Sequence, residues 1–308
     1  MSGDSVRSVL VLGPDLAPRD TVELGEDAAD AGSMSDIQAS PGGGGVYVLI
    51  THANASSVVE IPLAGGDVAA VTDAVPPRAS RLTITPRARQ LLVLAEGALH
   101  FTDPRRRELD RTVRVCESAA VGAAVLRHAD RAYVTCGEGS VAEINLRLRR
   151  PIRSSPLGAC GPGTPALSLN ETVLFVPCAE TGALLYLDRM TLTPIDTVAV
   201  APGIRDVMLS RKLNRAVVTG AVGIVALVEV RSRAVRFLEI SGPLLDAALS
   251  GDGRSAYLLV SGNMPAGRSL QELDLATATQ VASRPVPEWA SGIATWPGER
   301  TPVMWWRK

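Results

Sequence analysis

A unit of about 42 residues recurs along the whole chain, and it constrains the fold more than any single motif. Each copy starts with an apolar stretch, a polar turn and a second apolar stretch, which is the pattern of a β-hairpin. Aligning the copies on one turn position gives spacings of 45, 41, 42, 42, 40 and 45 residues. The aligned positions are Ser40, Thr85, Leu126, Ser168, Ser210, Ser250 and Thr295. So regular a period indicates a repeat fold.

A second strand pair follows each of the first six hairpins, so each repeat holds four short strands. The seventh hairpin has no such pair after it, and residues 5–25 supply the missing half. Joining the two halves closes a ring without leaving an exposed sheet edge. We therefore predict an all-β fold for residues 1–308, a seven-bladed β-propeller with four antiparallel strands per blade. Six continuous blades occupy about 35–289, and a composite blade combines 5–25 with 290–308.

Three segments carry a pattern known from one group of propellers. They are LSGDGRSAYLLV at 249–260, AYVTCGEGSVAEIN at 132–145 and LLYLD at 184–188. Together they resemble the repeat P-x-x-V-x-x-S-P-D-G-x-x-x-Y-V-T-N-x-x-x-x-x-V-x-V-I-D of the bacterial YVTN-repeat proteins. The resemblance implies a seven-bladed ring. The chain lacks the Gly-His and Trp-Asp pairs of WD40 repeats and the Ala-x-Asp-x-x-Thr-Gly-x-x-x-Trp pattern of quinone-type repeats.

Position within the repeat predicts the face of the ring on which a residue lies. The first strand of each blade lines the channel, the loops after the second and fourth strands form what we call the top face, and the hairpin turns form the bottom face. Asp36, Asp206 and Asp246 each lie four residues before an aligned position, so they should surround the top mouth of the channel, with Arg81 and Arg205 nearby. Such a group could bind a cation or a polar ligand. We favour the structural alternative, in which the carboxylates accept hydrogen bonds from loop amides.

The predicted bottom face is rich in arginine in the second and third blades. The residues concerned are Arg105, Arg106, Arg107, Arg147, Arg149 and Arg150. Guanidinium groups match phosphate and carboxylate, so this sector could dock an anionic partner. A solvated surface is the interpretation we favour, and we do not expect nucleic-acid binding, because no aromatic residues alternate with the arginines and the net charge is -1.

Four cysteines occupy matching positions in two successive repeats. Cys136 and Cys178 follow their aligned positions by ten residues, while Cys116 and Cys160 precede theirs by ten and eight. This phase favours the pairs Cys116–Cys136 and Cys160–Cys178, although four cysteines allow three pairings. The gaps of 19, 23 and 17 intervening residues disfavour a zinc site.

The expected disulfides place the protein in an oxidising compartment, so we expect a periplasmic or extracellular chain. The first residues show no export signal, so either the protein is cytosolic or a signal was removed, and the expected disulfides favour removal. A cytoplasmic protein with free thiols is the alternative. No apolar run is long enough to span a membrane.

The sequence shows no cluster of catalytic residues. The three histidines, His52, His100 and His128, fall on different predicted surfaces, and no nucleophile elbow or phosphate loop is present. We therefore predict no enzymatic activity and no cofactor or metal. The expected function is that of a binding or scaffold protein that presents its loop faces to a protein or another macromolecule in the bacterial cell envelope. The alternative is a propeller enzyme or redox-partner subunit, either lactonase-like or associated with a d1-type haem or a quinoprotein.

Overall fold

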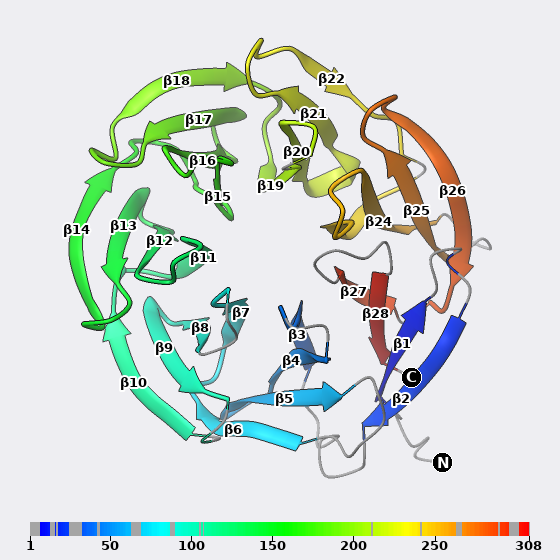
Figure 1. Ribbon diagram of the computed structural model, residues 1–308, viewed down its shortest axis with the longest axis horizontal. Coiled ribbons are helices and arrows are strands. Elements are labelled where there is room, and N and C mark those ends of the chain that lie inside the picture. Colours follow the sequence, from blue (N-terminus) through cyan, green and yellow to red (C-terminus); the bar gives the residue numbers. More distant parts are fainter. Residues whose placement is uncertain are drawn as a thin grey trace.

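The computed structural model describes most of the chain. The described residues are 7–12, 16, 18–24, 33–41, 44–62, 69–86, 90–104, 106, 108–210, 212–240, 242–262, 267–288, 290–295 and 302–307. Within these residues the strands form seven four-stranded antiparallel sheets, which stand around a central axis as the blades of an all-β propeller (Figure 1). Their only described helix is the single 3-10 turn η2 (Ala221–Gly223).

Six blades are each made of four consecutive strands. Blade one comprises β3 (Ser33–Ala39), β4 (Gly45–Thr51), β5 (Ser56–Pro62) and β6 (Ala69–Val75). Blade two comprises β7 (Ala79–Ile84), β8 (Leu91–Ala95), β9 (Ala98–Asp103) and β10 (Glu108–Arg114). Blade three comprises β11 (Ala120–Val125), β12 (Arg131–Cys136), β13 (Ser140–Asn145) and β14 (Arg150–Pro156). Blade four comprises β15 (Ala166–Leu167), β16 (Val173–Cys178), β17 (Ala183–Asp188) and β18 (Pro194–Ala199). Blade five comprises β19 (Ile204–Ser210), β20 (Arg215–Gly220), β21 (Val225–Glu229) and β22 (Val235–Phe237). Blade six comprises β23 (Leu244–Leu249), β24 (Ser255–Ser261), β25 (Arg268–Asp274) and β26 (Thr279–Val286).

The remaining sheet is a composite of both ends of the chain. Its order is β2-β1-β28-β27, with β27 (Ala290–Thr295), β28 (Pro302–Arg307), β1 (Arg7–Leu12) and β2 (Pro18–Leu24). Strands β1 and β28 pair antiparallel, with Val9 opposite Trp305. The ladder hydrogen bonds between them close the ring, so that neither strand is left as an unpaired edge.

The hydrophobic core lies between neighbouring blades. The second strands, such as β4 and β8, are buried along almost their whole length, because both of their faces pack against an adjacent blade. The fourth strands, such as β14 and β18, are largely exposed. One core cluster, for example, joins Phe175 and Val198 of blade four to Val207 and Val218 of blade five. The continuous apolar second strands of the repeats therefore supply much of the packing that joins neighbouring blades.

Blade four departs from the uniform strand length that the repeat suggests. Its inner strand β15 has two residues, against six or seven in the other inner strands. The preceding segment contains Pro162 and Pro165, which have no amide hydrogen for a ladder. Thr164 instead forms a parallel bridge with Asp206 of blade five, and the backbone at Gly163 comes so near that an added Cβ would lie 1.7 Å from the Arg205 carbonyl oxygen.

No helix among the described residues has the length and apolar character needed to cross a bilayer.

Candidate functional site

The channel opens into a cavity of about 720 Å³ lined by the inner strands. The structure brings together at this cavity the five polar residues predicted for the top mouth, Asp36, Arg81, Arg205, Asp206 and Asp246. We call the group of Asp36, Arg81, Asp206 and Asp246 the mouth cluster. Its members come from four different blades, so the ring closure is what makes them neighbours.

A β-bulge at the same point of six inner strands directs these side chains. The pairing register shifts just before the residue that faces the mouth, as between Met34 and Asp36 in blade one. A bulge bends a strand and re-aims the next side chain. The residues that follow the shifts are Asp36, Arg81, Gly122, Asp206, Asp246 and Gly292. The bulges were not predicted from the sequence, because the apolar alternation on either side of them is short.

Asp36 and Asp246 bind backbone amides of two blades each. Asp36 accepts hydrogen bonds from the amide of Ile37 at 2.9 Å and from that of Leu82 in the next blade at 2.7 Å. Asp246 accepts in the same way from Ala247 and from Ile293, both at 2.8 Å. These two carboxylates therefore tie the inner strand of one blade to that of the next.

Asp206 has a different partner. Its carboxylate pairs with the guanidinium of Arg81 at 2.9 Å, and both side chains are about a third exposed. Arg81 belongs to blade two and Asp206 to blade five, so the ion pair crosses the channel. Arg205 lies at the bulge itself, is exposed, and contributes its carbonyl oxygen to the Thr164 amide.

Charged side chains lie close together in the mouth cluster, and this arrangement shifts the pKa values of Asp36, Arg81 and Asp246. Burial raises the pKa of Asp246 to about 7, and the nearby Asp36 carboxylate adds to the rise, while hydrogen bonds from Ile293 and Ala247 and the charge of Arg81 oppose it. Burial also raises the pKa of Asp36, against the lowering effect of Arg81. For Arg81 burial acts to lower the pKa, but the carboxylates of Asp206, Asp36 and Asp246 outweigh it and raise that pKa. The mouth cluster can thus take up one proton near neutral pH, at Asp246.

We expect Arg81→Gln to raise the pKa of Asp246 further, above its value of about 7, because the variant removes a positive charge that favours the carboxylate. In the wild type the folded state holds a proton that the unfolded state releases, since the Asp246 pKa lies above the ordinary value of 3.8. The contribution to the free energy of unfolding is therefore greatest below pH 4 and is lost as pH rises through 7. Carboxyl ¹³C NMR from about pH 4 to 9 measures the midpoint directly. Arg205→Gln is the control, and an unchanged midpoint in Arg81→Gln would contradict the assignment.

The top face of blades three and four is cross-linked by two disulfides. Both predicted pairs are present, Cys116–Cys136 with a Cα–Cα distance of 5.4 Å and Cys160–Cys178 with one of 4.6 Å. Among the described residues, the one group with metal-ligand spacing is Cys116, Cys136 and Glu138. Because its two sulfur atoms are bonded to each other, they are not available as thiolate ligands.

Glu138 fixes the exposed loop beside the first disulfide. Its carboxylate accepts hydrogen bonds from the amides of Glu117 and Ser118, both at 3.1 Å, and from the Ser118 hydroxyl at 2.6 Å. Partial burial acts to raise the pKa of Glu138, but these hydrogen bonds outweigh it and lower the pKa to about 2. The loop is therefore held by a disulfide and by a carboxylate that stays ionised.

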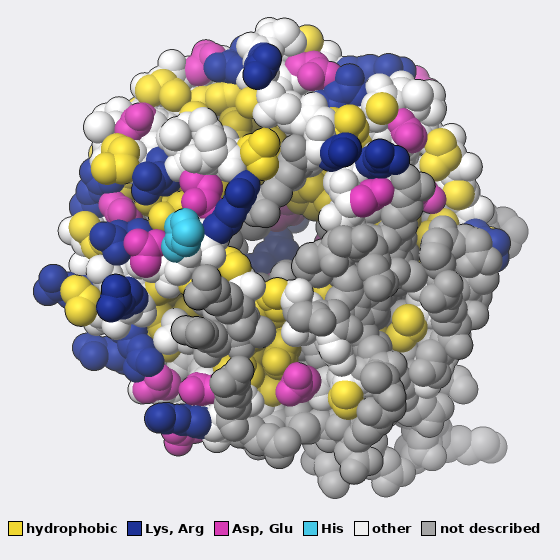
Figure 2. Space-filling view, viewed as in Figure 1, with side chains coloured by type: hydrophobic (Ala, Val, Ile, Leu, Met, Phe, Trp, Pro, Cys, Tyr) yellow, Lys and Arg dark blue, Asp and Glu magenta, His cyan; other side chains and the backbone are white. Residues whose placement is uncertain are grey.

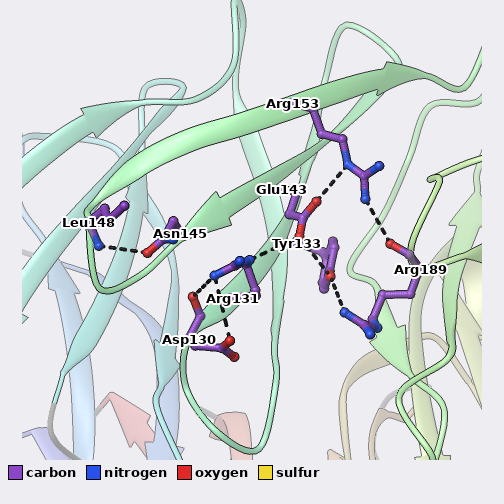
Figure 3. Close-up of polar contacts among 8 residues, drawn as sticks. All are labelled: Asp130, Arg131, Tyr133, Glu143, Asn145, Leu148, Arg153 and Arg189. Atoms are coloured by element: carbon purple, nitrogen blue, oxygen red, sulfur yellow. Dashed lines mark hydrogen bonds and ion pairs between the residues drawn. The ribbon is translucent and has the colours of Figure 1, made fainter.

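A network around the buried carboxylate of Glu143 connects blades three and four below this loop, through Arg189. The Glu143 carboxylate accepts a hydrogen bond from Arg153 Nε at 2.8 Å and lies 3.3 Å from Arg131 Nε. The Tyr133 hydroxyl donates to the same carboxylate at 3.4 Å (Figure 3). Arg189 of blade four donates to the same hydroxyl at 3.2 Å. This network was not predicted from the sequence. A signal for it was present, since Tyr47 and Glu60 form the same cross-strand pair in blade one.

The predicted basic face is only partly available to a partner. Arg105 and Arg107 lie outside the described residues. Arg149 forms an ion pair with Asp110 of blade two and lies 5.8 Å from the Phe101 ring, so it binds one blade to another. Arg106, Arg147 and Arg150 are exposed. Lys and Arg side chains gather along this rim, over β10 and β14 (Figure 2).

No family model matches the chain, and no curated protein matches its sequence. Solved structures do match. Hydrazine synthase of Kuenenia stuttgartiensis is 17% identical, with a TM-score of 0.77 over 88% of this chain and 91% of that one. The β-propeller domain of Myceliophteria thermophila Cps50 (Swd1) is 14% identical, with a TM-score of 0.71 over 89% and 96%. A chain of the mitotic checkpoint complex is 13% identical, with a TM-score of 0.73 over 89% and 87%. At these identities the similarity shows the propeller fold alone.

Proposed function

We propose that the chain is a non-enzymatic binding protein, a propeller of YVTN type that presents its top face to a protein or another macromolecule. The observation that supports this most is the cross-linked top surface of blades three and four, where two disulfides and the Glu138 hydrogen bonds fix exposed loops. A surface that is ordered before binding loses little conformational entropy when a partner docks.

The disulfides also bear on where the protein works. Disulfides persist in oxidising compartments and are rare in the cytosol. They therefore indicate an oxidising compartment, and we propose the periplasm or the outer side of the bacterial cell envelope. The structure of similar fold from the mitotic checkpoint complex comes, by its name, from an assembly, which is consistent with a protein partner for a ring of this kind.

The test is affinity capture from the envelope fraction of the source organism with the disulfide-bonded chain as bait. We expect one partner at stoichiometric yield with the wild type. The double variant Glu117→Lys, Glu180→Lys reverses two exposed charges on the top loops, and we expect at least tenfold less capture with it.

The matched control is Arg147→Glu with Arg150→Glu, which reverses two exposed charges on the bottom face and should leave the yield unchanged. Equal loss with both double variants would contradict recognition by the top face. A stoichiometric metal or visible chromophore in the purified protein would contradict a non-enzymatic function.

A further inference from the structure

A second cavity, of about 790 Å³, lies between blades four and five. We call it the four–five groove. Its walls come from three hairpin turns of the bottom face, which contribute Leu169 and Asn170 from the β15–β16 turn, Lys212 and Leu213 from the β19–β20 turn, and Arg231 from the β21–β22 turn. The groove is separate from the mouth cluster, since the two cavities share no lining residue.

The buried wall of the groove contains a hydroxyl group without a partner. Tyr186 is 1% exposed, and its ring packs edge-on against Phe175 at 4.7 Å. Its hydroxyl has no hydrogen-bond partner in the described part of the chain. A buried polar group in this state is unfavourable, so this wall of the groove is less well satisfied than the interface next to it. In the neighbouring interface, by contrast, Tyr133 is already satisfied by Glu143 and Arg189.

The groove has an excess of positive charge. The Arg233 guanidinium lies 4.2 Å from the centre of the Tyr186 ring and pairs with Asp196 at 2.5 Å, so this charge is neutralised. Glu229 is neutralised by Arg215. Lys212 and Arg231 are exposed and have no ion-pair partner among the described residues. Two cations are thus left for an acidic ligand.

Large apolar side chains stand beside these cations. Leu169 is 44% exposed and Ile195 is 56% exposed, and both line the groove. The space-filling view shows hydrophobic side chains next to Lys and Arg side chains over β18 and its junction with β22 (Figure 2). Exposed apolar surface bordered by polar groups is typical of an interaction site.

We propose that the four–five groove binds an acidic peptide segment of a protein partner, with an apolar anchor residue between its carboxylates. The anchor packs on Leu169 and Ile195, and the carboxylates pair with Lys212 and Arg231. A peptide fits these features better than a phosphate group does, because a phosphate would leave the apolar side chains exposed. The inference rests on the proposed function as a protein-binding propeller, but it concerns the opposite face.

The probe is an array of fluorescent heptapeptides, each with Leu, Ile, Phe, Met or Tyr at the centre and Asp and Glu around it. We expect the folded, disulfide-bonded protein to bind at least one of them, and to bind at least tenfold more weakly when Ser replaces the centre or Lys replaces the acids. Lys212→Glu with Arg231→Glu should also weaken binding at least tenfold. Arg147→Glu with Arg150→Glu is the matched control and should change nothing.

Leu169→Ser with Ile195→Ser separates the groove from general charge effects. Both side chains are exposed, so the variant should fold as the wild type does, and we expect at least tenfold weaker peptide binding because the anchor loses its apolar contacts. Unchanged peptide binding by this variant would contradict the assigned contact.

Three results would overturn the inference. They are no binding across the array, equal weakening by the matched control, and binding through Lys212 and Arg231 to phosphatidylglycerol vesicles in place of peptides. If Lys212→Glu with Arg231→Glu still captures the envelope partner and no peptide binds, the groove inference fails while the proposed function stands. If peptides bind the groove but the top-face variants do not affect capture, recognition by the top face fails instead.

Discussion

The double variant Cys116→Ala, Cys136→Ala is expected to unfold with a free energy about 3 kcal/mol lower than that of the wild type. The cross-link joins residues separated by 20 positions, and a loop of that length restricts the unfolded chain by roughly this amount. Both cysteines are buried, so alanine also leaves a small gap in the core beside the top loop. Urea denaturation, with the second disulfide verified by mass spectrometry, measures the difference.

The second disulfide provides the matched comparison. Cys160 and Cys178 are separated by 18 positions, so their double alanine variant should lose a similar free energy of unfolding. If the proposed function holds, both variants should also bind the envelope partner more weakly, because the loop must then be ordered on binding. A loss of less than about 1 kcal/mol in both variants would show that the cross-links do not stabilise the fold.

Glu143→Gln is expected to lower the free energy of unfolding by about 2 to 3 kcal/mol. The change removes the buried negative charge that Arg131 and Arg153 share and weakens the contact with Tyr133. Breaking a fully buried ion pair typically costs about 3 to 5 kcal/mol, and the smaller figure follows because both guanidinium groups are about a third exposed. Chemical denaturation at neutral pH measures the effect.

Two variants test whether the charge is responsible. Glu239→Gln removes an exposed carboxylate and should change the free energy of unfolding by less than about 0.5 kcal/mol. Tyr133→Phe keeps the carboxylate and should cost about 1 to 2 kcal/mol, because it removes the hydrogen bonds of the hydroxyl with Glu143 and Arg189. If Glu143→Gln is no more destabilising than Glu239→Gln, the network does not hold blades three and four together.

The features that follow from the period alone were predicted well. The repeat position put the cysteines in matching phase, which selected the pairs Cys116–Cys136 and Cys160–Cys178, and both disulfides are present. It also placed the four members of the mouth cluster on one cavity. These features depend on residues that occupy equivalent places in neighbouring repeats, and an alignment of the chain with itself shows such places directly.

The features that depend on departures from the repeat were not predicted. The short strand β15 has a local signal in Pro162 and Pro165, but the bridge that replaces it depends on the neighbouring blade. The pairing of Arg81 with Asp206 joins residues 125 positions apart, and nothing in the local sequence indicates which carboxylate the guanidinium reaches. Whether a buried hydroxyl finds a partner depends on which side chains meet at an interface, as the contrast between the satisfied Tyr133 and the unsatisfied Tyr186 shows.

The Arg81–Asp206 ion pair has a mechanical consequence for the ring. Adjacent blades are held to each other around the circumference, whereas this pair connects blade two to blade five across the diameter. It therefore adds a direct contact between two blades that are not neighbours in the ring. A cationic ligand that displaced Arg81 from Asp206 would remove this contact, so that occupancy of the channel would be coupled to the link between blades two and five.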